Sequence, residues 1–370
     1  MTSPLEAQIA REIAARGPIS VERFWTIALY DREHGYYVSR EPFGRAGDFT
    51  TAPEISQMFG ELIGAWIAGA WTALGRPSPF LLAEIGPGRG TLMADILRTL
   101  RQAAPACLSA ARIRLVEVSE RLAAVQATKL EPFDLPIRRV RHIGELEDLP
   151  TILVGNELFD ALAIRQAVVH EGRWHERVVE VDAEGRLAFG HGPELGALPG
   201  WMASVPPQSL RPGTIAEVSP ARDNLAAEIG RRLVAHGGAG LFIDYGHARS
   251  ALGDSLQAIA NHRYVPVLEA PGEADLTSHV DFERLSACFS ATGLEVAPIV
   301  TQGRFLLDMG LLERAGSLGG PLDEAGRNGL RQSVQRLAGG GKEDMGELFK
   351  VLACASRPIA LPPFGAVTSD

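Results

Sequence analysis

Residues 80–91, FLLAEIGPGRGT, decide the fold of this chain. The first six are a short apolar run that predicts a buried strand, and the sequence from Thr91 onward predicts a helix. Between them stand Gly86, Gly88 and Gly90, which lack a Cβ and let the backbone turn sharply beside a bound ligand. The N-terminus of the following helix would offer unpaired backbone N–H groups to that ligand. A plain glycine-rich turn is the competing interpretation.

Strands and helices alternate around this stretch. The alternation predicts an α/β domain with a mostly parallel sheet and helices on both faces. We expect a Rossmann-like sheet of seven strands, the last one antiparallel. Short paired strands between residues 164 and 218 interrupt the pattern and predict an inserted β-rich arm, and the Pro-rich tail after Arg357 is expected to be loosely held. The expected domains are an N-terminal helical cap with a lid loop (1–76), the ligand-binding domain (77–163 and 219–358) and the inserted β-rich subdomain (164–218).

The composition excludes several classes of function. Of the 370 residues, 46% are hydrophobic and 22% charged, as in ordinary globular proteins. The formal net charge of −9 argues against nucleic acid or anionic lipid as a partner. We expect no membrane insertion, because polar residues interrupt the long apolar stretch 55–74. Cys107, Cys288 and Cys354 are far apart, so we expect no metal site, no disulfide framework and a cytoplasmic location.

Two carboxylates accompany the glycine turn. The glycine spacing is GxGxG, which differs from the GxGxxG of dinucleotide-binding proteins, and no lysine of a phosphate-binding loop appears. Glu84 stands two residues before the first glycine and is expected at a polar end of the ligand. Glu117 ends the next predicted strand, where a carboxylate would accept hydrogen bonds from two ribose hydroxyls. The alternative for Glu117 is a surface residue that caps the next helix.

A cluster of polar residues follows the apolar run at 151–154, which we predict to be the fourth strand. Asn156, Glu157 and Asp160 stand at its C-terminal end, where open α/β sheets bind their ligands. Two carboxylates three residues apart would grip a guanidinium or hold a nucleophilic nitrogen in line for reaction. We assign Glu157 and Asp160 to catalysis and Asn156 to cofactor binding. The alternative is a helix N-terminus, where the helix dipole favours acidic side chains.

Two further segments supply candidates. His279, within DLTSHVDF at 275–282, would act as a general base or contact the substrate, although a lone histidine is more often structural. The irregular segment GDFTTAPEISQ at 47–57 leads into a helix predicted over 54–74 and would fold over the ligand as a lid. Thr51 and Pro53 are therefore assigned to cofactor binding. The alternative is that Pro53 merely opens the helix.

These motifs resemble those of the MidA-like family of S-adenosylmethionine (SAM)-dependent methyltransferases. That family includes a mitochondrial complex I assembly factor regarded as a protein arginine methyltransferase. The resemblance spans nearly the whole chain in order, and it departs from the family pattern near Ala163, where a proline is expected. The matching segments are HGYY (34–37), GDFTTAPEISQMFGE (47–61), EIGPGRGTL (84–92), VEVS (116–119), NELFDAL (156–162), DYGH (244–247), DLTSHVDF (275–282) and TQGRFLLDMG (301–310).

The resemblance implies an enzyme that uses SAM as its cofactor. It suggests ω-nitrogen methylation of an arginine in a protein, such as a respiratory complex I subunit, in the bacterial cytosol or, for relatives, the mitochondrial matrix. Two alternatives stay open: a small-molecule methyltransferase on the same scaffold, and a SAM-binding assembly factor with little turnover. The acceptor, the number of methyl groups transferred and the oligomeric state, a homodimer included, are not determined by the sequence.

Overall fold

The structure, a computed structural model, describes residues 3–39, 51–196, 200–203, 205–206, 210–260 and 263–367. The chain divides into two compact units. The sheet unit consists of Thr50–Leu158, Leu225–Ala248 and Val280–Asp370, and the cap unit consists of Met1–Phe49, Phe159–Asn224 and Arg249–His279. The α/β class expected from the sequence is confirmed. Within the described ranges, no helix has the length and apolar character that crossing a membrane requires.

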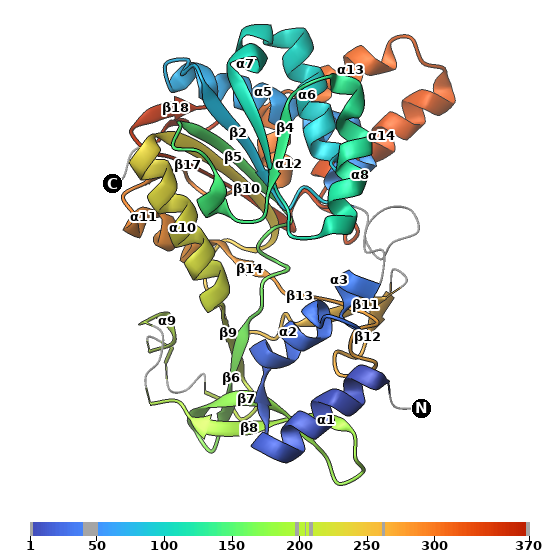
Figure 1. Cartoon of the computed structure of the whole chain (residues 1–370), viewed down its shortest axis with the longest axis vertical. Helices are drawn as coiled ribbons and strands as arrows, with labels where there is room; N and C mark the ends of the chain where they lie inside the picture. Colours follow the sequence, from blue (N-terminus) through green and yellow to red (C-terminus); the bar gives the residue numbers. More distant parts are fainter. Residues whose placement is uncertain are drawn as a thin grey trace. The chain divides into compact units, whose positions relative to one another are not determined.

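A nine-stranded mixed sheet forms the centre of the sheet unit (Figure 1). Five parallel strands lie side by side in the order β4 (Ile137–Val140), β3 (Ala111–Val116), β2 (Phe80–Ile85), β5 (Thr151–Asn156) and β10 (Gly238–His247). Antiparallel to β10 runs β17 (Phe349–Ala355). The remaining strands have two residues each: β14 (Val280–Asp281), β15 (Glu295–Val296) and β16 (Val300–Thr301).

The count of nine strands differs from the seven expected for two local reasons. The apolar run at 294–301 predicts one strand, but the structure divides it into β15 and β16 around Pro298, which cannot donate a ladder hydrogen bond. The two-residue strand β14 was not predicted and pairs with the end of β10. Every residue of β2 is buried, which explains why it reads as a continuous apolar run rather than an alternating one.

Helices pack closely against one another beside this sheet. Helix α5 (Gln57–Ala73) approaches α6 (Thr91–Ala103) through glycines, and a Cβ on Gly60 would lie 2.4 Å from the Cβ of Asp95. Likewise, α10 (Pro220–His236) and α11 (Phe282–Ala291) lie side by side in Figure 1, because Gly230 leaves room for Thr292. Small residues therefore set the helix spacing in this unit.

The structure corrects the helix predicted over 54–74. It contains a short α4 (Ala52–Ile55) and then α5, separated by Ser56. Ser56 is extended, with φ −159°, and its hydroxyl accepts a hydrogen bond of 3.3 Å from the backbone N–H of Met58. Serine at this position is a favourable N-cap, so the helix restarts there.

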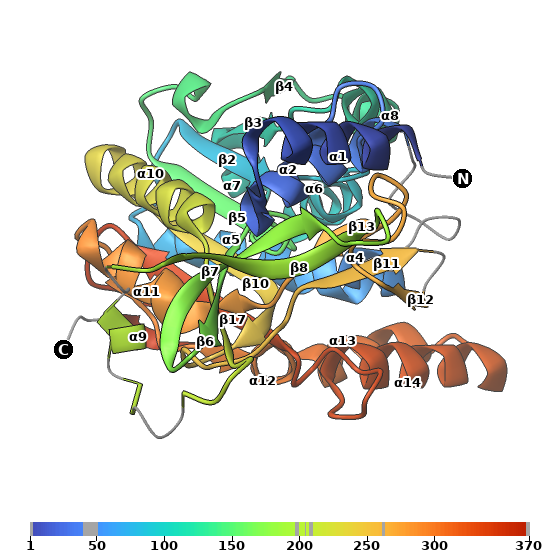
Figure 2. The same ribbon diagram turned by 90° about the horizontal axis from the view of Figure 1, so that it is seen from below.

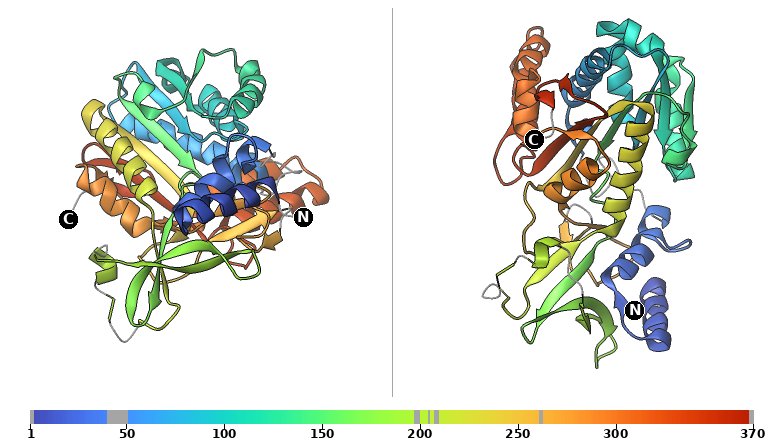
Figure 3. Two further views of the ribbon diagram at one scale, coloured as in Figure 1. Left: turned by 60° about the horizontal axis from the view of Figure 1, so that its bottom comes forward. Right: turned by 90° about the vertical axis from the view of Figure 1, so that its left-hand side faces the viewer.

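The C-terminal part of the sheet unit is more ordered than expected. A hairpin of β18 (Ile359–Leu361) and β19 (Gly365–Val367) follows the central sheet, and Leu361 is buried in the main core, so the expectation of a loosely held tail was wrong up to residue 367. Two helices, α13 (Leu311–Gly319) and α14 (Glu324–Ala338), lie side by side, as Figure 3 shows.

The cap unit contains two smaller antiparallel sheets. The five-stranded sheet joins β1 (Ile19–Ser20), β6 (Arg165–His170), β7 (Arg173–Val181), β8 (Leu187–Glu194) and β9 (Ile215–Val218), and Figure 2 shows β6, β7 and β8. The structure therefore contains strands where the sequence predicts the inserted β-rich arm. The three-stranded sheet of β11 (Gln257–Ala260), β12 (Arg263–Val265) and β13 (Asp275–Thr277) was not predicted.

The N-terminal helices share a core with the inserted strands. Helix α1 (Pro4–Arg16) begins after the N-cap Ser3, which the sequence predicts as part of the helix, and α2 (Val21–Tyr30) begins after the predicted N-cap Ser20. Ile9 and Trp25 from these helices belong to the same buried cluster as Val179 of β7. We expected the N-terminal cap and the insertion as separate parts, whereas contacts group them in one unit and assign α5 to the sheet unit.

Candidate functional site

The glycine turn adopts the backbone conformation for which glycine is suited. Gly86, Gly88 and Gly90 have φ angles of +65°, +52° and +78°, in the left-handed region that residues with a Cβ rarely adopt. A Cβ on Gly88 would meet no atom of the described residues within 4 Å, so these residues leave open space beside this part of the turn. The turn therefore has room for a ligand next to its backbone.

Three neighbouring strands end at the same level next to this turn. In the sheet register, Ile85 of β2 lies opposite Val116 of β3 and Gly155 of β5. The residues that follow these two partners are Glu117 and Asn156. The structure thus brings together the glycine turn, Glu117 and Asn156, as the sequence predicts for ligand-binding residues of an open α/β sheet.

Glu117 is 7% exposed and is held by two hydrogen bonds. Its Oε1 accepts the backbone N–H of Ser119 at 2.8 Å, and its Oε2 accepts Nε2 of Gln126 at 3.1 Å. Desolvation raises the pKa of Glu117, and these hydrogen bonds oppose that rise. The same Gln126 Nε2 donates to the backbone oxygen of Gly88 at 2.8 Å. Gln126 therefore connects the ribose candidate to the glycine turn.

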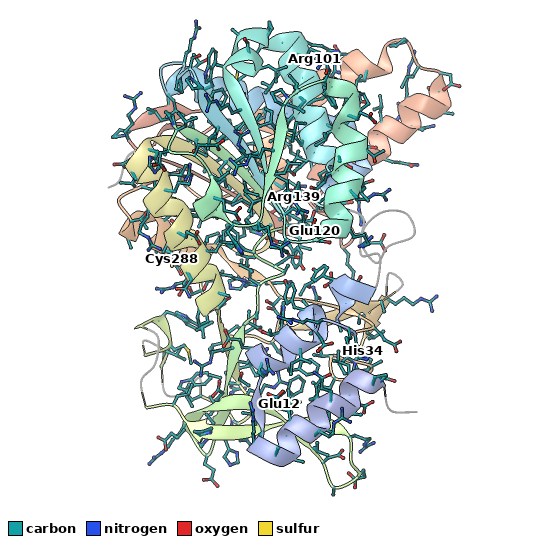
Figure 4. The ribbon with its side chains drawn as sticks, in the orientation of Figure 1. Glu12, His34, Arg101, Glu120, Arg139 and Cys288 are labelled. Atoms are coloured by element: carbon teal, nitrogen blue, oxygen red, sulfur yellow. The ribbon has the colours of Figure 1, made fainter. Side chains whose placement is uncertain are left out.

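An ion pair borders Glu117. Figure 4 labels Arg139 and Glu120, and an Nη2 of Arg139 lies 2.5 Å from Oε1 of Glu120. The positive charge of Arg139 is one of the causes that lower the pKa of Glu117 against the effect of burial. Glu117 is therefore a buried carboxylate with local support for its charge, rather than the surface helix cap that was the alternative.

Glu84 is the more strongly perturbed carboxyl. It is 3% exposed, and it accepts a hydrogen bond from the backbone N–H of Met93. Desolvation, followed by the negative charge of Glu117, raises the pKa of Glu84 to about 8. Its Oε2 is buried and has no hydrogen-bond partner among the residues described. The pair of carboxyls makes this end of the sheet a site that favours positive charge.

The unpartnered atoms of the site are all acceptors. Besides Glu84 Oε2, the buried Oε1 of Gln126 and Oδ1 of Asn156 also lack a partner within the described ranges. Buried acceptors without donors are costly, so a ligand rich in N–H and O–H groups and carrying positive charge would satisfy them. A diphosphate would add acceptors and negative charge. The residues therefore fit SAM, which has an ammonium, a sulfonium, ribose hydroxyls and an adenine amino group.

The segment predicted as a lid reaches the glycine turn at its described end. Residues 47–50 lie outside the described residues, whereas Thr51 is the N-cap of α4 and Pro53 is buried in its first turn. Thr91 follows Gly90 directly, and its hydroxyl donates to Oε1 of Glu54 at 2.7 Å. Thr51 and Pro53 thus stand on a short helix bonded to the start of α6. Their contact with cofactor stays a prediction.

Glu157 has an unusual backbone. Its φ of +51° is in the left-handed region, its N–H donates to the oxygen of Ile243 at 2.8 Å, and its Oε1 accepts Nδ2 of Asn156 at 3.1 Å. A glutamate held in this conformation stores strain, and strain of this kind concentrates at functional sites. This observation favours a functional role over a plain acidic helix start.

The other proposed catalytic carboxylate, Asp160, belongs to the cap unit. It is buried, and together with Asp275 it raises the pKa of Tyr37 well above the ordinary range, after the larger effect of desolvation. Tyr30 stacks on Tyr37 with ring centroids 5.5 Å apart, and Tyr36 meets the same ring edge-on at 5.4 Å. We call Tyr30, Tyr36, Tyr37, Asp160 and Asp275 the acidic–aromatic cluster.

Parts of this cluster lie in the sequence motifs quoted above, which gave them no assigned role. Tyr36 and Tyr37 stand in HGYY, and Asp275 opens DLTSHVDF. Gln126 and Glu54 were also missed, and of these only Glu54 lies in a quoted motif. The family motifs could therefore have indicated four of these residues, namely Tyr36, Tyr37, Glu54 and Asp275. No motif contains Gln126.

His279 is half-buried in the cap unit and is fixed through its backbone. Its N–H donates to the hydroxyl of Ser255 at 2.9 Å, and its carbonyl accepts Nη1 of Arg222 at 2.7 Å. Whether its imidazole takes part in the reaction stays a prediction. Over the ranges that the structure covers, no cluster of His, Cys, Asp and Glu could hold a metal ion, and none of the three cysteines forms a disulfide.

Comparisons with known proteins agree with the chemistry of the sheet unit. Residues 62–300 match a family described as "Putative S-adenosyl-L-methionine-dependent methyltransferase". The chain is 35% identical to protein arginine methyltransferase NDUFAF7, mitochondrial, of Mus musculus, over 95% of this chain and 84% of that protein. The Danio rerio protein of the same name is 36% identical, over 92% and 84%.

Solved structures are similar over nearly the whole chain. A Burkholderia thailandensis protein bound to S-adenosyl-homocysteine superposes with a TM-score of 0.77 and 26% identity, over 95% of this chain and 91% of that one. A native crystal structure from the same organism gives 0.79 and 27%, over 98% and 95%. From its motifs, its site chemistry and these similarities, the chain belongs to this family of S-adenosyl-L-methionine-dependent methyltransferases, and SAM is its cofactor.

Proposed function

We propose that this methyltransferase transfers the methyl group of SAM to a side-chain nitrogen of an arginine in a protein. The observation that carries the proposal is the acidic–aromatic cluster, in which two carboxylates lie near stacked tyrosine rings. Carboxylates pair with a guanidinium, and aromatic faces attract it as well. The relatives named as protein arginine methyltransferases support the same acceptor.

We assign the cofactor roles with the support of the geometry of the sheet unit. Glu117, oriented by Gln126, accepts hydrogen bonds from the ribose hydroxyls, and Glu84 pairs with the ammonium end. Gly86, Gly88 and Gly90 leave space for the methionine part, and Asn156 offers a buried acceptor beside them. Thr51 and Pro53 complete the assignment as neighbours of the turn. SAM supplies a reactive sulfonium when bound.

The remaining residues have the task of placing the acceptor. Because the sulfonium is already activated, alignment of the attacking nitrogen and placement of charge supply most of the rate. We assign Glu157 and Asp160 to the orientation of the guanidinium and to the balance of its charge, and His279 to substrate contact or proton acceptance. These assignments rest on residue chemistry and on the strained backbone of Glu157.

The finer features of the fold and the setting belong to the same proposal. The seven-position path β15-β17-β10-β5-β2-β3-β4, parallel from β10 to β4, supports a Rossmann-like methyltransferase sheet. The acceptor to be tested first is a respiratory complex I subunit, which the MidA-like resemblance suggests. We place the reaction in the cytoplasm, and we leave the oligomeric state open, with a homodimer as one option.

The test is incubation of the purified protein with methyl-labelled SAM and a candidate complex I subunit, followed by mass spectrometry of the labelled residue. Methylarginine at a single site, with formation of S-adenosylhomocysteine, is the expected result. A label found only in the small-molecule fraction of a lysate would instead favour a small-molecule methyltransferase. Binding of SAM without formation of S-adenosylhomocysteine in either mixture would favour an assembly factor.

A further inference from the structure

Arg222 has an unusual set of partners in the cap unit. It lies in the first turn of α10, is 8% exposed, and directs its guanidinium at the backbone of two motif segments. From NELFDAL, it binds the carbonyl of Phe159 through Nε at 2.7 Å and that of Asp160 through Nη2 at 3.4 Å. A single side chain therefore engages the carbonyl group of a proposed catalytic residue.

The second segment bound by the same guanidinium is DLTSHVDF. Nη1 donates to the carbonyl of His279 at 2.7 Å, and Nη2 donates to the hydroxyl and the carbonyl of Ser278 at 2.7 and 3.2 Å. Segments more than a hundred residues apart in sequence are thus joined through one side chain.

Two serines hold Arg222, which we call the anchor, and the segments that it binds. The backbone N–H of Arg222 donates to the hydroxyl of Ser219 at 3.2 Å, and that hydroxyl donates to the carbonyl of Ala163 at 2.7 Å. From the other side, the hydroxyl of Ser255 accepts the N–H of His279 and donates to Glu217. A movement of NELFDAL or DLTSHVDF would therefore break hydrogen bonds to Arg222 or to these serines.

We infer that Arg222 is a positioning residue that fixes Asp160 and His279 relative to each other for methyl transfer. Its planar fork presents five N–H donors in fixed directions, which matches carbonyls arranged on two sides of it. A lysine has three donors at one point and does not reproduce this planar fork. The inference rests on the proposed function for its catalytic meaning, whereas the structural coupling it describes is independent of the acceptor.

The first test measures the coupling without any acceptor. We would compare amide hydrogen exchange of Arg222→Lys with that of the unmodified protein, in peptides that contain Leu162 and His279. Both amides are hydrogen-bonded, to Phe159 O and Ser255 Oγ. We expect exchange to accelerate in both segments together by about tenfold or more, because buried carbonyls lose their donors. Unchanged exchange in either segment would overturn the inference.

Arg232 provides a matched control on the same helix. It is also partly buried and donates to two backbone carbonyls, those of Leu146 and Glu147, in the sheet unit. Arg232→Lys removes the same kind of contact from a loop that contains none of the candidate residues. We expect faster exchange around residues 143–149 only. If it disturbed peptides 156–162 and 275–281 as Arg222→Lys does, the effect would be general loosening and the inference would fail.

The second test asks whether the coupling matters for turnover. With an acceptor identified by the labelling experiment, Arg222→Ala should lower kcat by about a hundredfold, while the Kd for SAM changes less than threefold. Added guanidinium chloride at millimolar concentration should restore part of the kcat that Arg222→Ala loses. The same addition should leave the kcat of Arg232→Ala unchanged. Wild-type kcat in Arg222→Lys would overturn the role of Arg222 in positioning for turnover. If Arg222→Ala does not fold, Arg222→Lys carries the comparison. If no acceptor protein is found, the proposed function fails. The hydrogen-exchange measurement would still test whether Arg222 couples the two segments.

Discussion

The protonation state of Glu84 should control how tightly the protein binds SAM. Burial and the charge of Glu117 raise the pKa of Glu84 to about 8, so the carboxyl is mostly neutral in the ligand-free protein at pH 7. The cationic end of SAM favours the ionised form. Binding at neutral pH must therefore release a proton from Glu84, and Glu84→Gln should abolish that release.

The magnitude follows from the fraction of protein that has Glu84 ionised. With a pKa of about 8, that fraction is roughly 1% at pH 6 and roughly 9% at pH 7. The apparent Kd for SAM should therefore fall about ninefold over this unit of pH, which corresponds to about 1.3 kcal/mol. Above about pH 8 the gain should end, because Glu84 is then mostly ionised in the free protein and the α-amino group of SAM loses its own proton in the same range.

The same shift has a consequence for stability, with a definite sign. The folded protein holds the Glu84 proton that the unfolded chain releases near the ordinary pKa of 4.5. The contribution of Glu84 to the free energy of unfolding should therefore fall as pH rises from about 4.5 to about 8, and it should be constant above the folded pKa. The full difference is about 5 kcal/mol as an upper bound. Glu84→Gln should flatten this part of the stability profile.

Isothermal titration calorimetry with SAM is the assay, run between pH 6 and 8.5 in buffers of different ionisation enthalpy. The buffer dependence reports the protons released on binding, close to one at pH 7 for the unmodified protein. Glu120→Gln, at an exposed glutamate paired with Arg139, is the matched control and should keep the full dependence. A flat Kd from pH 6 to 7, or an equal slope in Glu84→Gln, would refute the reasoning.

Three further predictions concern single residues. Glu117→Ala should raise the Kd for SAM about a hundredfold, because it removes two charge-assisted hydrogen bonds, and an unchanged Kd by calorimetry would remove the ribose assignment. Asp160→Asn should leave SAM affinity within about twofold and lower kcat at least tenfold, since it removes charge and keeps shape; full activity in the labelling assay would contradict its role. Gly60→Ala should lower the free energy of unfolding by about 1–3 kcal/mol in urea titrations, because its Cβ would lie 2.4 Å from that of Asp95. As a control, Gly144→Ala should change the free energy of unfolding by less than about 0.5 kcal/mol, because no described residue lies within 4 Å of that Cβ.

Local sequence signals predicted the elements around the cofactor site well. The apolar run at 80–85 became β2 with the same bounds, and Ser20 caps a helix as expected. These features depend on residues within a few positions of one another. An example is a serine hydroxyl that accepts a hydrogen bond from the backbone N–H three residues later. Glycine spacing and a carboxylate at the next strand end are equally local, which is why the sequence alone pointed to the adenosyl ligand.

Pairings between distant segments could not be predicted in the same way. Strand β1 has only two residues, yet Ile19 pairs with Val179, about 160 positions later in the chain. No periodicity in two residues can indicate a partner, so the shared core of the N-terminal helices and the insertion was missed. Gln126 and Arg222 were missed for a related reason, because both bind backbone carbonyls, which leave no pattern of residue types in the sequence.

Two groups of residues make different contributions to the reaction, because only some of the bound chemical groups change during methyl transfer. The ribose and the ammonium are the same in SAM and in the product, so Glu117 and Glu84 stabilise ground state and transition state alike. Such uniform binding lowers Kd without raising kcat. Rate acceleration must therefore come from residues that align the acceptor, for which Glu157, Asp160 and the anchor Arg222 are the candidates. Variants of the first group should change the Kd for SAM and variants of the second should change kcat. A substitution at Glu117 that lowered kcat at saturating SAM would show that the cofactor contacts change during the reaction.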